Sequence, residues 1–146
     1  LIPEDIEGHI QLKNTITWIP IATGEDHHTR IPFRQLIEHR AVDVVQPDLS
    51  WCGGLSEAIK IYTLAQAFGL KTIPHGGANT PWGQHFAYAM PESSMAEYWL
   101  GTAPGIPLDE VRPIPGMAMP IDGKITPTDA PGFGIEILES QIIPRD

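Results

Sequence analysis

The sequence predicts an α/β fold in which short strands and helices alternate along the chain. Two runs rich in β-branched residues, at residues 42–46 and 71–74, flank a stretch at residues 55–68 whose apolar side chains recur with the spacing of one helix face. Gly69 follows that stretch, where a glycine readily takes the left-handed conformation that ends a helix. A strand, a helix and a second strand in this order form a βαβ unit with parallel strands. We therefore expect a parallel sheet covered by helices.

The sequence on either side of this unit repeats the same alternation. Three further helices are expected at residues 7–16, 32–40 and 82–90. Two further strands are expected at residues 17–22 and 96–100. Thr80 suits the N-cap of the last helix, and Pro81 suits its first position, where a missing N–H costs nothing.

One ionisable side chain stands at or near the end of each expected strand. These side chains are Glu25, Asp48, His75 and Glu97, separated by 23, 27 and 22 residues. A βα unit takes about this length in a (β/α)8 barrel of roughly 250 residues. We interpret residues 1–100 as the second half of such a barrel, with about four strands. Half a barrel has two bare edges, so we do not expect it to be stable alone.

The composition changes after this region. Proline and glycine dominate residues 101–146, where a hairpin is expected around Asp122 and Gly123 and a small edge strand within residues 131–137. We interpret this part as an extended tail that packs on something else, rather than as a second domain. The chain begins with Leu1 rather than Met, and we expect it to be part of a longer protein.

Charge and cysteine content exclude several classes of function. Eighteen acidic residues against nine basic ones, without a run of Lys or Arg, argue against nucleic acid or an anionic membrane as partner. No apolar run reaches the length that spans a membrane. The single cysteine, Cys52, excludes an internal disulfide and fits a reducing, cytoplasmic compartment. We interpret Cys52 as a small packed residue rather than a nucleophile.

The strand-end residues indicate proton chemistry. An Asp and a His on neighbouring strands, Asp48 and His75, form a dyad in which the carboxylate selects the imidazole tautomer. Such a His can take a proton from carbon and later return one to a leaving hydroxyl. The alternative makes Asp48 a loop cap and His75 a surface residue.

The other candidates each have a structural alternative. Glu25 is either a hard oxygen ligand for Mg²⁺ or a solvated loop residue. Glu97 stands in an apolar run, where an unpaired buried carboxylate is costly, and this favours a role in the site. Three tryptophans either wall a sugar pocket or pack in the core, which is the default for this residue type; they are Trp51, Trp82 and Trp99.

Five short motifs follow one another in the chain. They are Gly-Glu (24–25), Gln-Pro-Asp (46–48) with Trp-Cys-Gly-Gly-Leu (51–55), Pro-His-Gly (74–76), Glu97 and Pro-Gly-Phe-Gly-Ile-Glu (131–136). In this order they resemble the enolase superfamily, with the mandelate-racemase-like sugar-acid dehydratases as the nearest group. The resemblance covers nearly the whole chain. It implies a C-terminal half barrel whose tail returns to a capping domain that this chain does not contain.

The resemblance also implies a reaction and a role for each residue. The reaction is Mg²⁺-dependent dehydration of a sugar acid, with L-rhamnonate as the expected substrate and a 2-keto-3-deoxy acid as product. Glu25 would be one of three carboxylate ligands of Mg²⁺. Asp48 would orient His75, and His75 would remove the proton α to the carboxylate and then protonate the leaving β-hydroxyl. Glu97 would bond to the substrate carboxylate as it becomes an enediolate.

Two positions near Glu25 bear on the choice of substrate. Asp26 stands where related dehydratases have a histidine that faces the substrate, and His27 is a further candidate for substrate contact. Because of this departure, another sugar acid is an alternative substrate, and racemisation or epimerisation is an alternative reaction. A non-catalytic barrel fragment is the alternative from a different class.

The rest of the metal site would lie upstream of this chain. The other two ligands and the capping domain would belong to an enzyme of about 400 residues, within the size range of such barrels. We expect this chain alone to be inactive, because one carboxylate does not hold Mg²⁺ usefully. The resemblance further implies a homo-oligomer.

Overall fold

The computed structural model describes residues 1–93, 95–101, 103–107, 110 and 114–143. The helices are α1 (Ile6–Thr15), α2 (Arg30–Glu38), α3 (Leu55–Ala67), α4 (Pro81–Ala89) and two short 3₁₀ turns, η1 (Gly77–Asn79) and η3 (Glu139–Gln141). The strands are β1 (Ala22–Thr23), β2 (Val44–Val45) and β3 (Lys71–Thr72). Among the described residues no helix has the length and apolar character needed to cross a bilayer.

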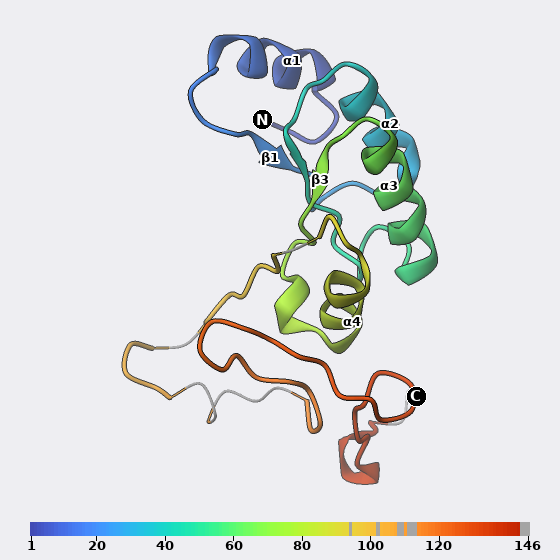
Figure 1. Cartoon of the computed structure of the whole chain (residues 1–146), viewed down its shortest axis with the longest axis vertical. Helices are drawn as coiled ribbons and strands as arrows, with labels where there is room; N and C mark the ends of the chain where they lie inside the picture. The colour runs from blue at the N-terminus through green and yellow to red at the C-terminus, as the bar shows by residue number, and fades with distance from the viewer. Residues whose placement is uncertain (94, 102, 108–109, 111–113, 144–146) are drawn as a thin grey trace.

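The strands form one parallel sheet in the order β1-β2-β3, which confirms the expected α/β fold. Thr23 pairs with Val45, and Val45 pairs with Thr72, so these three residues lie at one level of the sheet. Helices α2 and α3 connect the strands and lie together along one side of the sheet (Figure 1). Hydrogen bonds continue beyond the named strands, from the N–H of His75 to the carbonyl of Pro47 at 3.2 Å.

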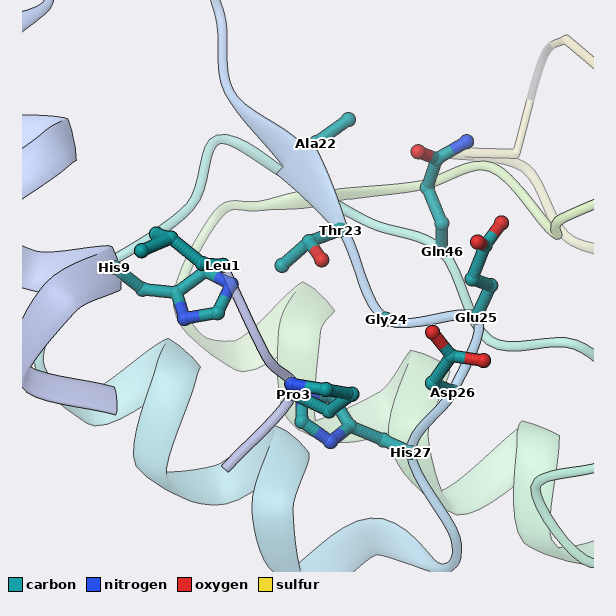
Figure 2. Close-up of a pocket in the computed structure, with 10 residues that line it drawn as sticks. All are labelled: Leu1, Pro3, His9, Ala22, Thr23, Gly24, Glu25, Asp26, His27 and Gln46. Atoms are coloured by element: carbon teal, nitrogen blue, oxygen red, sulfur yellow. The ribbon is translucent and has the colours of Figure 1, made fainter. Parts of the chain in front are cut away.

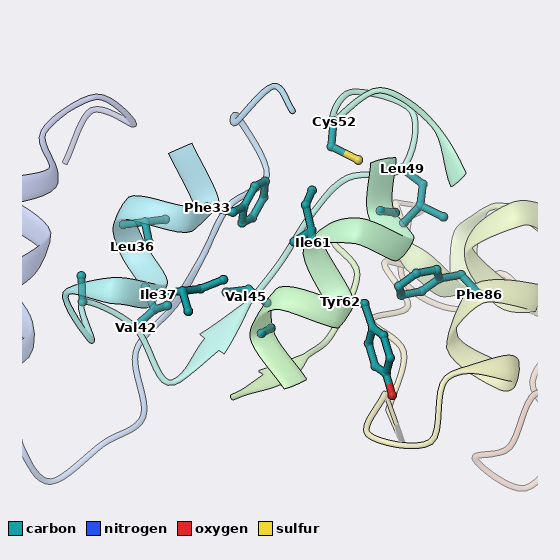
Figure 3. Packing of buried hydrophobic residues seen from close by; sticks show 13 residues of the cluster. Phe33, Leu36, Ile37, Val42, Val45, Leu49, Cys52, Ile61, Tyr62 and Phe86 are labelled. Carbon is teal, nitrogen blue, oxygen red and sulfur yellow. The ribbon is translucent and has the colours of Figure 1, made fainter. Parts of the chain in front are cut away.

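The core lies between this sheet and its helices (Figure 3). Its fully buried side chains come from α2, β2, α3 and α4, and include Phe33, Leu36, Ile37, Val45, Ile61 and Phe86. The spacing of Phe33, Leu36 and Ile37 places them on one face of α2, as the sequence predicts. Burial of these faces removes apolar surface from water, which is the main favourable contribution to folding.

The ends of the helices follow the predicted chemistry. Gly69 has φ +71° just after α3, the left-handed conformation expected there. The Thr80 hydroxyl accepts the N–H of Gly83 at 3.2 Å, and Pro81 is the first residue of α4. Both expectations for α4 are therefore confirmed.

Glu57 makes a connection between helices that the sequence did not reveal. This buried carboxylate in the first turn of α3 accepts the backbone N–H of Arg30 at 3.0 Å, at the start of α2. It also pairs with the Arg30 guanidinium at 2.7 Å and the Lys60 ammonium at 3.0 Å. A free N–H at the start of α2 is thereby satisfied from α3.

The first expected strand is present but shorter and shifted along the chain, and the strand expected at residues 96–100 is wrong. Only Ala22 of residues 17–22 belongs to β1, because Pro20 has no N–H to donate to a ladder and the chain bends at Trp18, which is 79% exposed. Residues 96–100 are extended but form no ladder with β3. The turn η1 lies next to them instead, and the Ala78 N–H donates to the Glu97 carbonyl at 2.9 Å.

The C-terminal part contains the expected hairpin but not the edge strand. Ile121 and Lys124 exchange two backbone hydrogen bonds around Asp122 and Gly123, both with positive φ. Residues 131–137 form no strand, but the Glu136 N–H donates to the Pro115 carbonyl at 3.0 Å, and the Phe133 ring packs against Trp82 and His85 of α4. In Figure 1 this part lies beyond α4, at the end of the molecule away from the N-terminus. Other positions of the expected tail (102, 108–109, 111–113 and 144–146) lie outside the described residues.

Candidate active site

The register of the sheet brings three candidate residues to one end of it. Thr23, Val45 and Thr72 lie at one level, and the chain continues from each in the same direction. Glu25 follows two residues after Thr23, whereas Asp48 and His75 follow three residues after Val45 and Thr72. The carboxyl ends of parallel strands are where α/β folds place their sites.

Asp48 and His75 are in contact, as the sequence predicts. His75 Nδ1 lies 3.3 Å from Asp48 Oδ2, and the other carboxylate oxygen accepts the N–H of Ser50 at 2.7 Å. The bond from the Ser50 N–H is a local turn that Asp commonly makes with the residue two positions ahead, so Asp48 caps its loop as well as contacting His75. Asp48 is thus held by its own loop while it orients the imidazole.

Glu25 approaches the opposite side of the same ring. Its Oε2 lies 2.7 Å from His75 Nε2, so each ring nitrogen of His75 faces a carboxylate oxygen. Gly24 makes this placement possible, because a Cβ there would lie 2.6 Å from the Phe33 ring and 3.0 Å from the Gln46 carbonyl. Figure 2 shows Gly24, Glu25 and Asp26 in order after β1.

Glu97 joins this group through the backbone of the His75 loop. Its Oε2 accepts the N–H of Gly76, the residue after His75, at 2.9 Å. The half-buried carboxylate therefore has a hydrogen-bond partner although its segment is not a strand. The structure thus brings together all four strand-end candidates, Glu25, Asp48, His75 and Glu97.

Two cavities open beside His75. The larger of the two has a volume of about 440 Å³, and its lining includes Asp48, His75, Glu97 and Trp99. The smaller has a volume of about 270 Å³, and its lining includes Glu25, Asp26, Asp48, His75 and Trp51. Trp51 and Trp99 are 54% and 73% exposed, so the default expectation of core packing is wrong for both. Trp82 is partly buried against the core and donates its indole N–H to Ser50 Oγ at 3.3 Å.

His27 lies away from the two cavities that His75 lines. It is 5% exposed and packs edge-on against Phe33 with ring centroids 5.5 Å apart. Burial, with a further contribution from His9, lowers the pKa of His27 below its ordinary value. His9 and His27 line a third cavity, of about 250 Å³ (Figure 2). Asp26 lines this third cavity and also the smaller cavity beside His75.

Cys52 is packed, as the sequence predicts. Its side chain is fully buried, and burial together with the nearby Asp48 carboxylate raises the pKa of its thiol to about 11. A thiol with this pKa carries almost no thiolate at neutral pH, and the thiolate is the nucleophile.

The end of β1 carries a side chain suited to a hard metal ion. Glu25 presents an exposed carboxylate, the hard oxygen donor that Mg²⁺ prefers, at the end of β1. Within residues 1–93, 95–101, 103–107, 110 and 114–143, no three His, Cys, Asp or Glu side chains gather where they could hold a metal ion.

An imidazole between two carboxylates at the carboxyl ends of parallel strands is an arrangement that can transfer protons. A family model for enolase C-terminal domain-like proteins matches residues 1–141, and the chain belongs to this family. The enolase superfamily inferred from the sequence motifs is thereby confirmed.

Relatives of the chain include sugar-acid dehydratases. The chain is 34% identical over 143 residues to L-rhamnonate dehydratase of Saccharopolyspora erythraea. The aligned region covers 94% of this chain and 35% of the relative. L-rhamnonate dehydratase from Gibberella zeae is similar in structure, with TM-score 0.76 and 31% identity over 96% of this chain and 36% of that one.

A third relative was crystallised with a metal. L-talarate dehydratase from Polaromonas sp. JS666, complexed with Mg and L-glucarate, is similar with TM-score 0.75 and 30% identity, over 96% of this chain and 36% of that one. The chain thus spans about a third of the length of these relatives.

Proposed function

We propose that this chain forms one part of a Mg²⁺-dependent sugar-acid dehydratase that acts on L-rhamnonate. The placement of His75 between Asp48 and Glu25 at the strand ends is the observation on which the proposal depends. The two L-rhamnonate dehydratases among the relatives support the choice of substrate. The rest of the barrel, the capping domain and the other metal ligands would come from residues outside this chain.

His75 is the proposed base and acid. Asp48 holds Nδ1, so Nε2 is the atom that takes the proton α to the substrate carboxylate. The same nitrogen then gives a proton to the β-hydroxyl, which leaves as water. The loss of one proton and one hydroxyl yields the enol of the 2-keto-3-deoxy acid.

Glu97 is the proposed partner of the substrate carboxylate. One of its oxygens accepts the Gly76 N–H, and the other would bind the substrate. Glu97 would hydrogen-bond the carboxylate oxygen on which charge develops during α-proton removal. Glu25 would be the ligand that this chain supplies to Mg²⁺. When bound, the metal would neutralise charge on the substrate carboxylate.

The test is a panel of sugar acids with the complete enzyme that contains this chain, in Mg²⁺ buffer. We expect 2-keto-3-deoxy acid to form fastest from L-rhamnonate, and His75→Asn to lower kcat by about 10²–10⁴-fold, the usual contribution of a general acid–base. A His75→Asn enzyme with unchanged turnover would contradict the proposal and favour a non-catalytic role. A product of the same composition as the substrate would indicate a racemase or epimerase.

A different sugar acid is the second candidate. Asp26, next to Glu25, lines the smaller cavity beside His75 and presents an exposed carboxylate to it. The similarity to L-talarate dehydratase supports a substrate of the hexarate type. Faster turnover of L-talarate or galactarate than of L-rhamnonate in the same panel would select this candidate.

A further inference from the structure

An asparagine in the turn after His75 holds the segment that bears Glu97. The side-chain N–H of Asn79 donates to the Trp99 carbonyl at 2.7 Å, and its side-chain oxygen accepts the Trp99 N–H at 2.8 Å. A carboxamide offers one donor and one acceptor side by side, as a backbone amide does in a ladder. Asn79 thus replaces the strand pairing that residues 96–100 do not form.

A backbone bond completes this attachment and directs Glu97. The Ala78 N–H donates to the Glu97 carbonyl at 2.9 Å, so η1 holds the segment at both residue 97 and residue 99. While η1 holds the backbone of Glu97, the Glu97 carboxylate accepts the N–H of Gly76 at 2.9 Å. Gly76 directly follows His75. The distance from Glu97 to His75 therefore depends on how η1 holds the segment.

The turn η1 is itself firmly anchored. Gln84 of α4 is 3% exposed, and its amide donates to the carbonyls of Ala78 at 2.8 Å and Ala118 at 2.9 Å. A Cβ at Gly83 would lie 2.3 Å from the Gly77 carbonyl oxygen, so α4 packs directly on η1. Asn79 consequently projects from a support that α4 holds in place.

We propose that Asn79 is a positioning residue that sets the Glu97 carboxylate relative to His75 for the reaction. The role of Glu97 in turnover rests on the proposed function, whereas the attachment by Asn79 does not. Misplacement of a catalytic group by about 1 Å can cost on the order of 100-fold in rate, so such a support matters to the rate.

The first test is amide hydrogen exchange in Asn79→Ala, with Asn14→Ala as the matched control. Asn14 is exposed in the last turn of α1, far along the chain from the site. We expect faster exchange at Trp99 and also at Gly76, and no change at either in the control. Gly76 is the informative position because its N–H bonds to Glu97 and not to Asn79. Unchanged exchange at Gly76 would overturn the proposal.

The second test is a double-mutant cycle in the complete enzyme. Asn79→Ala is expected to lower kcat by up to about 100-fold and to change KM by less than about threefold. In an enzyme that already carries Glu97→Gln, adding Asn79→Ala should lower kcat by less than about a further threefold. The reason is that the Glu97 carboxylate, which Asn79 positions, has already been removed. Additive losses, or a loss confined to thermal stability, would show that Asn79 does not act through Glu97. Absence of turnover by the wild-type enzyme would refute the proposed function and leave the exchange result to decide the attachment.

Discussion

His75 is held from three directions at the end of the sheet. Its backbone N–H donates to the Pro47 carbonyl, Nδ1 faces Asp48 and Nε2 faces Glu25. Both bonds to side chains can form together only when both ring nitrogens carry protons. The proposed role of Nε2 as a base therefore requires the Glu25 carboxylate to move away from this nitrogen, which it contacts at 2.7 Å.

Glu57 is the residue whose charge we expect to affect stability with pH. The Arg30 backbone N–H, and then the Lys60 and Arg30 side chains, lower the pKa of Glu57 from 4.5 to about 2. A carboxyl whose pKa is lower in the folded state stabilises the fold above its unfolded pKa. That stabilisation is lost as the pH falls from about 4.5 to about 2.

We therefore expect Glu57→Gln to destabilise the protein at pH 7 and to have a diminishing effect below about pH 4.5. Urea unfolding of the wild type and of Glu57→Gln between pH 7 and pH 2 measures the difference in their free energies of unfolding. Glu38→Gln is the control, since Glu38 makes an exposed ion pair with Arg34 at 3.7 Å, worth at most about 1 kcal/mol. If the free energies of unfolding of the wild type and Glu57→Gln differed by the same amount at every pH, the stabilising role of the ionised Glu57 carboxylate would be contradicted.

At the scale of elements, α3 joins the sheet to α2. Ile61 is fully buried in the core between these elements, whereas Ile59 on the same helix is 39% exposed. Helix periodicity predicts that residues two positions apart face different directions. The same substitution at these two positions therefore separates burial from helix propensity.

Ile61→Ala is expected to lower the free energy of unfolding by about 2–5 kcal/mol, through lost burial and a cavity that the core cannot fully close. Ile59→Ala should cost less than about 1 kcal/mol because its side chain remains partly in water. Chemical denaturation of the two variants beside wild type measures both values. Equal costs at the two positions would be inconsistent with the packing in Figure 3.

Most of the elements were predictable because their signals are local. Apolar spacing along α2 and α3, the glycine after α3 and the cap of α4 each depend on residues within a few positions. The strand expected at residues 96–100 was wrong for the opposite reason. Its apolar run is compatible with a strand, but η1 occupies the place of a pairing partner, and this depends on how the chain turns after β3.

At the scale of the whole molecule, the chain exposes large apolar side chains. Trp18, Trp99 and Ile143 are 79%, 73% and 88% exposed. Within the described residues the sheet has three strands, and β1 and β3 form its edges. Exposed apolar surface and open edges are typical of surfaces that bind other polypeptide. This supports the proposal that residues outside this chain complete the barrel.

We expect the 146-residue chain alone to form no 2-keto-3-deoxy acid from L-rhamnonate in Mg²⁺ buffer. Glu25 is its one proposed metal ligand, and a single carboxylate holds Mg²⁺ too weakly without further ligands. The measurement is a colorimetric assay for the keto acid, with a complete sugar-acid dehydratase as positive control. Turnover by this chain alone would refute the idea that its metal site is completed from outside.

The sequence by itself determined the four α-helices, the central strand–helix–strand unit and the placement of Glu25, Asp48 and His75 after strands. These features depend on periodicity and short-range chemistry, which a single chain displays directly. Only the tertiary structure decided which atoms meet: His75 between two carboxylates, Glu97 on the Gly76 N–H, and Asn79 in place of a strand. Such contacts join residues about 20 or more positions apart, and register and packing, rather than local pattern, bring them together.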